Sequence, residues 1–166
     1  MKKYVFRKYD KNFPKFFEKE KILLARIIPF YLKIEHIGST SIPDLGGKGI
    51  VDVLLVVDKN RINLAKFILV KHGFFHMSEV LHKSRISFFK NYGFLFFKRR
   101  VHIHLTYPKS KTLRETLKFK HLLLTNPDLA KQYAEIKQKG VKIAAGNGKV
   151  YRKYKKKFVE RLSRDK

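Results

Sequence analysis

The chain contains no cysteine and no tryptophan among its 166 residues. The absence of cysteine excludes a disulfide framework and a metal site with thiolate ligands. It is typical of a protein of the reducing cytoplasm, which is the location that we expect. No apolar run approaches the roughly 20 residues that a membrane-spanning helix needs, and the basic N-terminus lacks the apolar segment of a signal peptide. The sequence therefore predicts a protein that has no membrane partner.

Acidic residues are also scarce. Asp and Glu number 13 against 39 Lys and Arg, which gives a formal net charge of +26. A field of this size attracts polyanions, so one interpretation is an RNA, DNA or nucleotide partner. The other is a lysine-rich composition that spreads positive charge over every solvated face. Because the basic residues are spread along nearly the whole chain, both interpretations stay open.

Apolar residues make up 44% of the chain, enough for a core in one domain that spans residues 1–166. Their spacing predicts α/β architecture, with a mixed, mainly antiparallel sheet flanked by helices. We expect helices at 13–28, 60–71, 111–124 and from 127 onward, and strands at 31–35, 50–57, 84–92 and 93–107 with a turn around Asn91-Tyr92-Gly93.

A polar loop between two of these strands organises the chain. The loop begins with His36-Ile37-Gly38-Ser39-Thr40-Ser41, and the second strand, Ile50-Val51-Asp52-Val53-Leu54, is apolar except for its acid. A Gly-Ser pair that leaves a strand offers N–H groups and hydroxyls to an anion. A lone carboxylate buried in a strand is costly, so we expect Asp52 to face a cleft that holds a cation.

Two histidines alternate with apolar residues in Val101-His102-Ile103-His104-Leu105. Because successive strand residues point to opposite faces, His102 and His104 share one face. Two imidazoles on one face can bind a metal, move protons or contact phosphate. The alternative is that this face is solvated and needs polar residues.

The loop and the acid together resemble the GrpB family, which belongs to the nucleotidyltransferase-like superfamily. The motif is His-Ile-Gly-Ser-Thr-Ser-Ile-Pro, then a lysine, then Ile-Val-Asp, and the His-x-His strand also resembles that family. The resemblance implies a nucleotidyltransferase-like fold. It also implies an enzyme that transfers a nucleotidyl group from a nucleoside triphosphate to an acceptor, and the positive charge makes RNA or another polyanion a candidate for a further partner.

The resemblance also implies roles for particular residues. It gives catalysis to Asp52, His104 and His102, and a divalent metal, Mg²⁺ or Mn²⁺, to Asp52 and His104. Lys137 matches a family Tyr-x-x-x-Lys pattern, and Lys48 stands where the family carries a lysine. The implied nucleotide- and phosphate-binding residues are Gly38, Ser39, Thr40, Ser41, Lys48 and Lys137.

One position departs from the superfamily pattern of Asp-x-Asp or Asp-x-Glu. The second acid should stand at position 54, where this chain has Leu54. Mg²⁺ prefers oxygen ligands, so one carboxylate with a histidine suits Mn²⁺ better. The alternative function is therefore a non-catalytic module that binds a nucleotide or RNA on a degenerate nucleotidyltransferase fold.

The end of the chain predicts a basic helix at about 149–164. Tyr151, Tyr154 and Phe158 repeat at helical spacing among many lysines and arginines, and we expect residues 140–148 to form a flexible connection before them. Such a helix either packs its aromatic edge on the domain or contacts nucleic acid.

Overall fold

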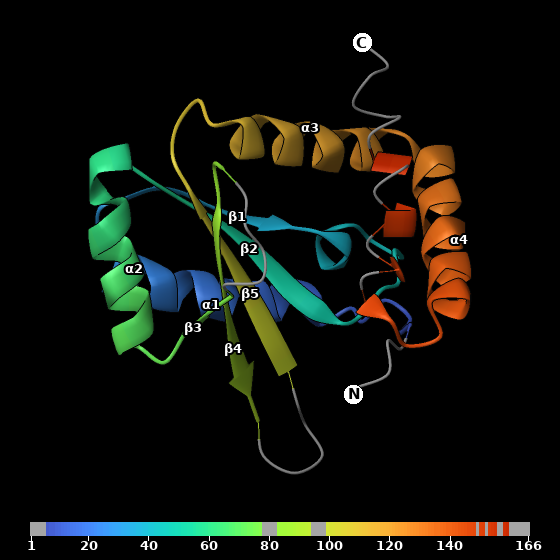
Figure 1. Ribbon diagram of the computed structural model, residues 1–166, viewed down its shortest axis with the longest axis horizontal. Coiled ribbons are helices and arrows are strands. Elements are labelled where there is room, and N and C mark those ends of the chain that lie inside the picture. The colour runs from blue at the N-terminus through green and yellow to red at the C-terminus, as the bar shows by residue number, and fades with distance from the viewer. Residues whose placement is uncertain are drawn as a thin grey trace.

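A computed structural model describes residues 6–77, 83–93, 99–148, 150–151, 153–155 and 158–159 of the chain. They form one α/β domain around a five-stranded sheet in the order β1-β2-β5-β4-β3 (Figure 1). The strands are β1 Tyr31–Ile37, β2 Ile50–Val57, β3 Phe75–His76, β4 Ile86–Tyr92 and β5 Arg99–Thr106. Among the strands of the described ranges, only β2 and β5 pair in parallel, so the predicted mixed, mainly antiparallel sheet is confirmed.

Helices cover both faces of this sheet. The helices are α1 Phe13–Ile27, α2 Ile62–Lys71, α3 Lys111–Thr125 and α4 Pro127–Ala144, with short 3-10 turns at η1 Ser39–Ser41 and η2 Lys59–Arg61. Strand β2 alternates between the two layers. Val51, Val53 and Leu55 pack with α1 and α2, whereas Leu54 and Val56 face α3. Because Asp52 shares the face of Leu54, it lies on the α3 side of the sheet.

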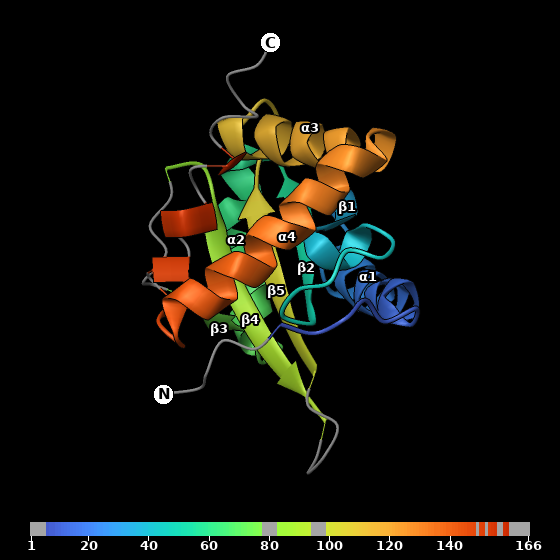
Figure 2. The same cartoon turned by 90° about the vertical axis from the view of Figure 1, so that its right-hand side faces the viewer.

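The loop between β1 and β2 is fixed from outside by α3 and α4. Ile42 and Leu45 of the loop are buried with Leu123 of α3 and Tyr133 of α4. Figure 2 shows α4 nearest the viewer and α3 above it. Apolar contacts from two helices therefore hold the polar loop against the end of the sheet.

Two predictions about chain breaks are wrong. The expected flexible connection at 140–148 is mostly helix, since α4 continues to Ala144 and ends where Ala145 and Gly146 take positive φ angles of 44° and 91°. Gly140 lies inside α4 because aromatic rings occupy the space of a side chain: a Cβ there would lie 3.0 Å from Cδ1 of Tyr154. The turn expected around Asn91-Tyr92-Gly93 is also misplaced, because Tyr92 still pairs with Arg99 in the sheet.

The predicted C-terminal helix is described in part. Residues 150–151, 153–155 and 158–159 are helical, and the ring of Phe158 stacks on Tyr133 at 5.5 Å. Tyr151 is buried. These contacts agree with an aromatic edge that packs on the domain. Residues 149, 152, 156–157 and 160–164 of the expected helix, and residues 94–98 of the expected strand at 93–107, lie outside the described part of the chain.

None of the helices in the described ranges combines the length and the apolar character that crossing a membrane requires.

Candidate functional site

The parallel pairing of β2 with β5 brings three polar side chains together. Asp52 lies opposite His102, and Leu54 lies opposite His104, so the carboxylate and both imidazoles are on one face. Oδ1 of Asp52 lies 3.4 Å from Nδ1 of His102 and 3.2 Å from Nε2 of His104. One carboxylate oxygen thus faces two imidazole nitrogens.

The cluster is mostly removed from water but stays open to it. The side chains of Asp52, His102 and His104 are 24%, 17% and 15% exposed. Burial alone would raise the pKa of the Asp52 carboxyl, but hydrogen bonds and charge interactions with both histidines outweigh burial and hold that pKa well below its usual range. Burial lowers the pKa of His104. At neutral pH the site therefore presents an ionised carboxylate beside a neutral imidazole.

The outer nitrogens of the two rings differ in their surroundings. Nδ1 of His104 lies 3.5 Å from Oγ of Ser87, a buried residue of β4 directly opposite His104. Nε2 of His102 is buried and has no hydrogen-bond partner within the described residues. An orphaned buried polar atom at a polar cluster indicates a missing ligand, ion or water.

The donor set fits a divalent metal ion. Asp52, His102 and His104 each offer one ligand atom, and these three atoms lie within 4.8 Å of one another. One carboxylate and two imidazoles suit Mn²⁺, Fe²⁺ or Zn²⁺, whereas Mg²⁺ prefers a shell of oxygen atoms. Of the two ions that the sequence suggested, this donor set suits Mn²⁺ better than Mg²⁺.

Gly38 lets the loop pass directly over the carboxylate. Its backbone angles are φ 73° and ψ −169°, a region that is essentially restricted to glycine. A Cβ atom at this position would lie 2.5 Å from Oδ2 of Asp52. The sequence therefore needs glycine here both for the turn and for the close approach.

The hydroxyls of the loop divide into two kinds. Thr40 is buried, and its Oγ1 donates to the carbonyl of Ile50 at 3.1 Å. The same Oγ1 atom accepts a hydrogen bond from Nε2 of His36 at 3.0 Å. Oγ of Ser41 donates to the carbonyl of Gly38 at 2.8 Å. These two hydroxyls hold the loop itself, and Ser39 is the one whose Oγ lies beside the backbone of Gly47.

His36 supports the loop from the opposite face of the sheet. Its ring stacks on Phe17 of α1 at 4.7 Å and 6°. Burial and the charge of Lys120 lower the pKa of His36 to about 4, so the ring is neutral at physiological pH. A neutral ring can donate one hydrogen bond to Thr40 and pack on an aromatic ring, and the first residue of the motif is therefore part of the scaffold.

Lysines from three segments meet near the loop. Lys137 of α4 is buried, and its Nζ donates to the carbonyl of Gly46. Burial and the charge of Lys155 lower the pKa of Lys137 to about 7. The phenol of Tyr133 is the largest influence on Lys155 and raises its pKa. Nζ of Lys48 lies 5.2 Å from the ring of Tyr151.

The charge of Asp52 raises the pKa of both Lys137 and Lys155. Lys137 and Lys155 therefore lie within range of the acid's charge, and Oγ of Ser39 lies beside Gly47 together with Nζ of Lys137. An anionic group bound there would contact positive charge and would lie next to the cluster of Asp52 and the histidines.

Sequence reasoning missed Arg85. It directly precedes β4, and its charge lowers the pKa of His104, so it lies near the site. Burial lowers the pKa of Arg85, the charge of Asp52 raises it, and its Nε has no partner within the described chain. The local sequence around Arg85 gives no signal for this, because the site is formed only when β4 pairs with β5.

Substituting Gly38 by alanine should damage the site and the fold together. The positive φ angle and the contact with Oδ2 of Asp52 predict a loss of about 1–2 kcal/mol in the free energy of unfolding. Because the carboxylate must also shift, we expect weaker Mn²⁺ binding by titration calorimetry. Gly73→Ala is the control, since Gly73 has a φ of +79° but no contact with Asp52. Unchanged Mn²⁺ affinity in Gly38→Ala would show that the loop does not position the acid.

Comparison with solved structures supports the fold. A GrpB protein of Enterococcus faecalis superposes with a TM-score of 0.76 and 24% sequence identity, over 96% of this chain and 99% of that one. The Cid1 poly(U) polymerase superposes with a TM-score of 0.51 and 14% identity, over 79% of this chain and 45% of that one. These similarities show the predicted nucleotidyltransferase-like α/β fold.

Relatives in sequence point the same way. The glutamate-rich protein GrpB of Alkalihalophilus pseudofirmus is 27% identical over 158 residues, which cover 93% of this chain and 90% of that protein. The YqkA protein of Bacillus subtilis is 29% identical over 132 residues, which cover 78% of this chain and 37% of that protein. The GrpB protein family model matches residues 4–165. The chain therefore belongs to the GrpB family.

Proposed function

We propose that this protein transfers a nucleotidyl group from a nucleoside triphosphate to an acceptor hydroxyl, with one divalent ion at Asp52, His102 and His104. The observation that carries the proposal is the convergence of these three side chains, with Asp52 directly against Gly38 of the loop. The fold is shared with Cid1, whose solved structure is described as bound to MgATP.

In this proposal the phosphates lie along the loop. The N–H groups near Ser39 and the ammonium groups of Lys137 and Lys48 hold the β- and γ-phosphates, so that the α-phosphorus faces Asp52. A bound ion would neutralise charge on the α-phosphoryl group and lower the pKa of the acceptor hydroxyl. Ser87 orients the ring of His104 through its Nδ1 atom.

The reaction forms a bond between the acceptor oxygen and the α-phosphorus and breaks the bond between that phosphorus and the bridging oxygen. The hydroxyl proton leaves to water. The pKa of Lys137, about 7, suits its Nζ to donate a proton to the departing pyrophosphate and to recover one from water. The charges and protons then balance without a further reactant.

The test is incubation of the purified protein with each α-labelled nucleoside triphosphate, total RNA, and either Mn²⁺ or Mg²⁺. We expect label in the acceptor and release of pyrophosphate, with Mn²⁺ more effective than Mg²⁺ because of the imidazole ligands. Equal rates without any divalent ion would contradict the proposal.

A second candidate is a non-catalytic module that binds a nucleotide or RNA. It is favoured by Leu54, which stands where the superfamily pattern has a second acid. Leu54 is fully buried in a cluster with Ile37, Val56 and α3, so this part of the sheet face offers no second set of oxygen ligands. Nucleotide binding without transfer or pyrophosphate release for any triphosphate would favour this candidate.

A further inference from the structure

Five residues form one row across the face of the sheet that carries the site. The strand register aligns Ile37, Asp52, His102, Phe89 and Phe75, one from each strand in spatial order. Directly opposed residues point to the same face, and neighbouring strands lie about 4.8 Å apart. Two aromatic rings therefore continue the line that starts at the acid and the histidine.

The two rings belong to a three-layer stack. The rings of Phe75 and Phe89 stack with centroids 5.4 Å apart and an angle of 27° between their planes. The guanidinium carbon of Arg100 lies 5.0 Å from the ring of Phe89, and Nε of Arg100 donates to Oδ1 of Asn91 at 2.8 Å. Asn91 thus fixes Arg100 against Phe89.

The outer layer of the stack faces solvent. Phe75 is 61% exposed, although it lies in the sheet beside the buried Phe74. An exposed phenylalanine that ends an ordered stack can accept one more planar group on its free side. Guanidinium and aromatic groups in one stack beside a phosphate-binding site are the elements that bind single-stranded nucleic acid.

We propose that Phe75, Phe89 and Arg100 form a platform on which a base of the acceptor stacks, so that the acceptor is the end of a single-stranded RNA. This inference rests on the proposed function, because it places the acceptor beside His102. The separation fits the polymer: Phe75 lies two strand spacings from His102, about 10 Å, which one or two nucleotides span. The net charge of +26 complements a polyanionic occupant.

The experiment compares the affinities of three fluorescent probes for the full chain by anisotropy at moderate salt. The probes are a single-stranded RNA decamer, the same backbone without bases, and a duplex of the same length. We expect the single strand to bind tightest, because only it offers free base faces. Equal binding of the probe without bases would overturn the platform, because charge alone would then explain the affinity.

Phe75→Ala should weaken binding of the single-stranded probe by about 10-fold to 100-fold, the range expected for one stacked base. Phe75→Trp should retain the wild-type affinity. Phe67→Ala is the matched control, since Phe67 on α2 is 64% exposed but has no place in the row, and it should leave binding unchanged. Equal affinities for Phe75→Ala and wild type would reject the proposal.

The failure of this inference is distinguishable from the failure of the proposed function. Binding of a nucleoside triphosphate is measured separately and should be the same in Phe75→Ala and wild type. If Phe75→Ala loses RNA binding but the wild type shows no transfer activity, the platform is supported and the proposed enzyme activity is rejected. Transfer that is equally efficient in Phe75→Ala and wild type would support the enzyme and reject the platform. Base-independent binding with self-association through this face would identify it as a protein contact instead.

Discussion

Replacing Asp52 by asparagine is expected to weaken Mn²⁺ binding by on the order of 100-fold and to abolish nucleotidyl transfer. Asparagine keeps the size of the side chain but removes the charge that faces His102 and His104 at 3.4 and 3.2 Å. Titration calorimetry with Mn²⁺, and the paramagnetic resonance signal of the free ion, measure the loss directly without any assumption about the reaction.

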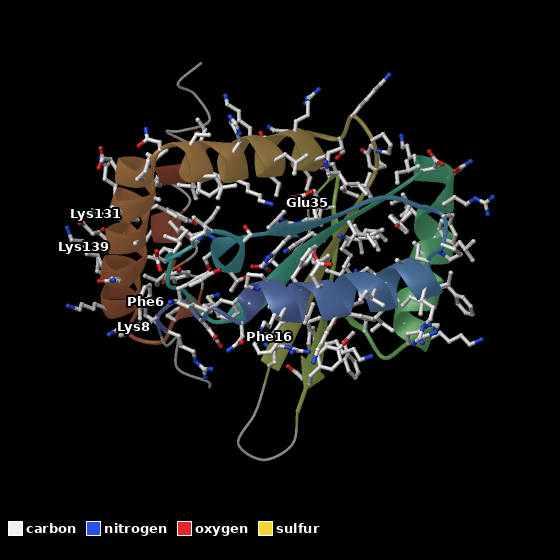
Figure 3. The ribbon with its side chains drawn as sticks, turned by 180° about the vertical axis from the view of Figure 1, so that it is seen from behind. Phe6, Lys8, Phe16, Glu35, Lys131 and Lys139 are labelled. Carbon is white, nitrogen blue, oxygen red and sulfur yellow. The ribbon has the colours of Figure 1, made fainter. Side chains whose placement is uncertain are left out.

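Glu35→Gln provides the matched control. Glu35 lies on β1, on the same face of the sheet, and Figure 3 shows it between β1 and α3. Its side chain is 28% exposed against 24% for Asp52, and it pairs with Lys120 at 2.5 Å. Its neutralisation removes one negative charge at a similar depth and should leave Mn²⁺ affinity unchanged. Equal losses of Mn²⁺ affinity in Asp52→Asn and Glu35→Gln would show that the net negative charge of this region governs binding, without a specific role for Asp52 as a ligand.

The pH dependence of Mn²⁺ binding should follow the same groups. Hydrogen bonds from His102 and His104 keep the pKa of Asp52 below its usual range against the opposing effect of burial, and burial lowers the pKa of His104. Asp52 and His104, two of the three proposed ligands, therefore stay in the form that binds metal as the solution is acidified below the ordinary pKa of histidine, about 6.5. A loss of affinity already near that value would contradict this arrangement of charges.

Local pattern was sufficient to predict the inner part of the site. A Gly-Ser turn after a strand, a lone acid in an apolar strand and two alternating histidines each have a direct physical reading, and the structure does bring Gly38, Asp52, His102 and His104 together. What the pattern lacked was the parallel pairing of β2 with β5. Residues 58–98 separate these strands, and local sequence patterns do not predict which distant strands pair.

The outer part of the site depended on strand register. With a turn around Asn91-Tyr92-Gly93, the hairpin would not have set Ser87 opposite His104 or Phe89 opposite His102, as the structure does. A shift by an odd number of residues also exchanges the two faces of a strand. The sequence therefore did not predict that Arg85 and the aromatic row lie near the site.

Roles within the loop were beyond sequence reasoning for another reason. Thr40 and Ser39 are adjacent hydroxyl residues, yet one is buried on the carbonyl of Ile50 and the other lies beside Gly47. The 3-10 turn at Ser39–Ser41 sets this difference by rotating successive side chains, and composition does not encode it.

Replacing Lys137 by methionine is expected to stabilise the protein while it weakens triphosphate binding at least 10-fold. The pKa of Lys137 is about 7 in the folded chain, against about 10.4 for an unfolded one. Between these values the unfolded state binds more protons, so the wild-type free energy of unfolding rises with pH across that window. Below this pH window, the folded chain bears the full free-energy penalty of a buried ammonium group, and the substitution by methionine removes that penalty.

We expect Lys137→Met to raise the free energy of unfolding by about 2–3 kcal/mol near pH 6, after the lost hydrogen bond to the carbonyl of Gly46 is subtracted. The gain should shrink above about pH 7 and vanish near pH 10, as urea unfolding at several pH values would show. Lys131→Met and Lys139→Met are controls on the same helix, where both side chains point away from the domain (Figure 3). A Lys137→Met protein that is less stable than wild type near pH 6 would mean that the lysine is a structural clamp, because its contacts would then outweigh its burial.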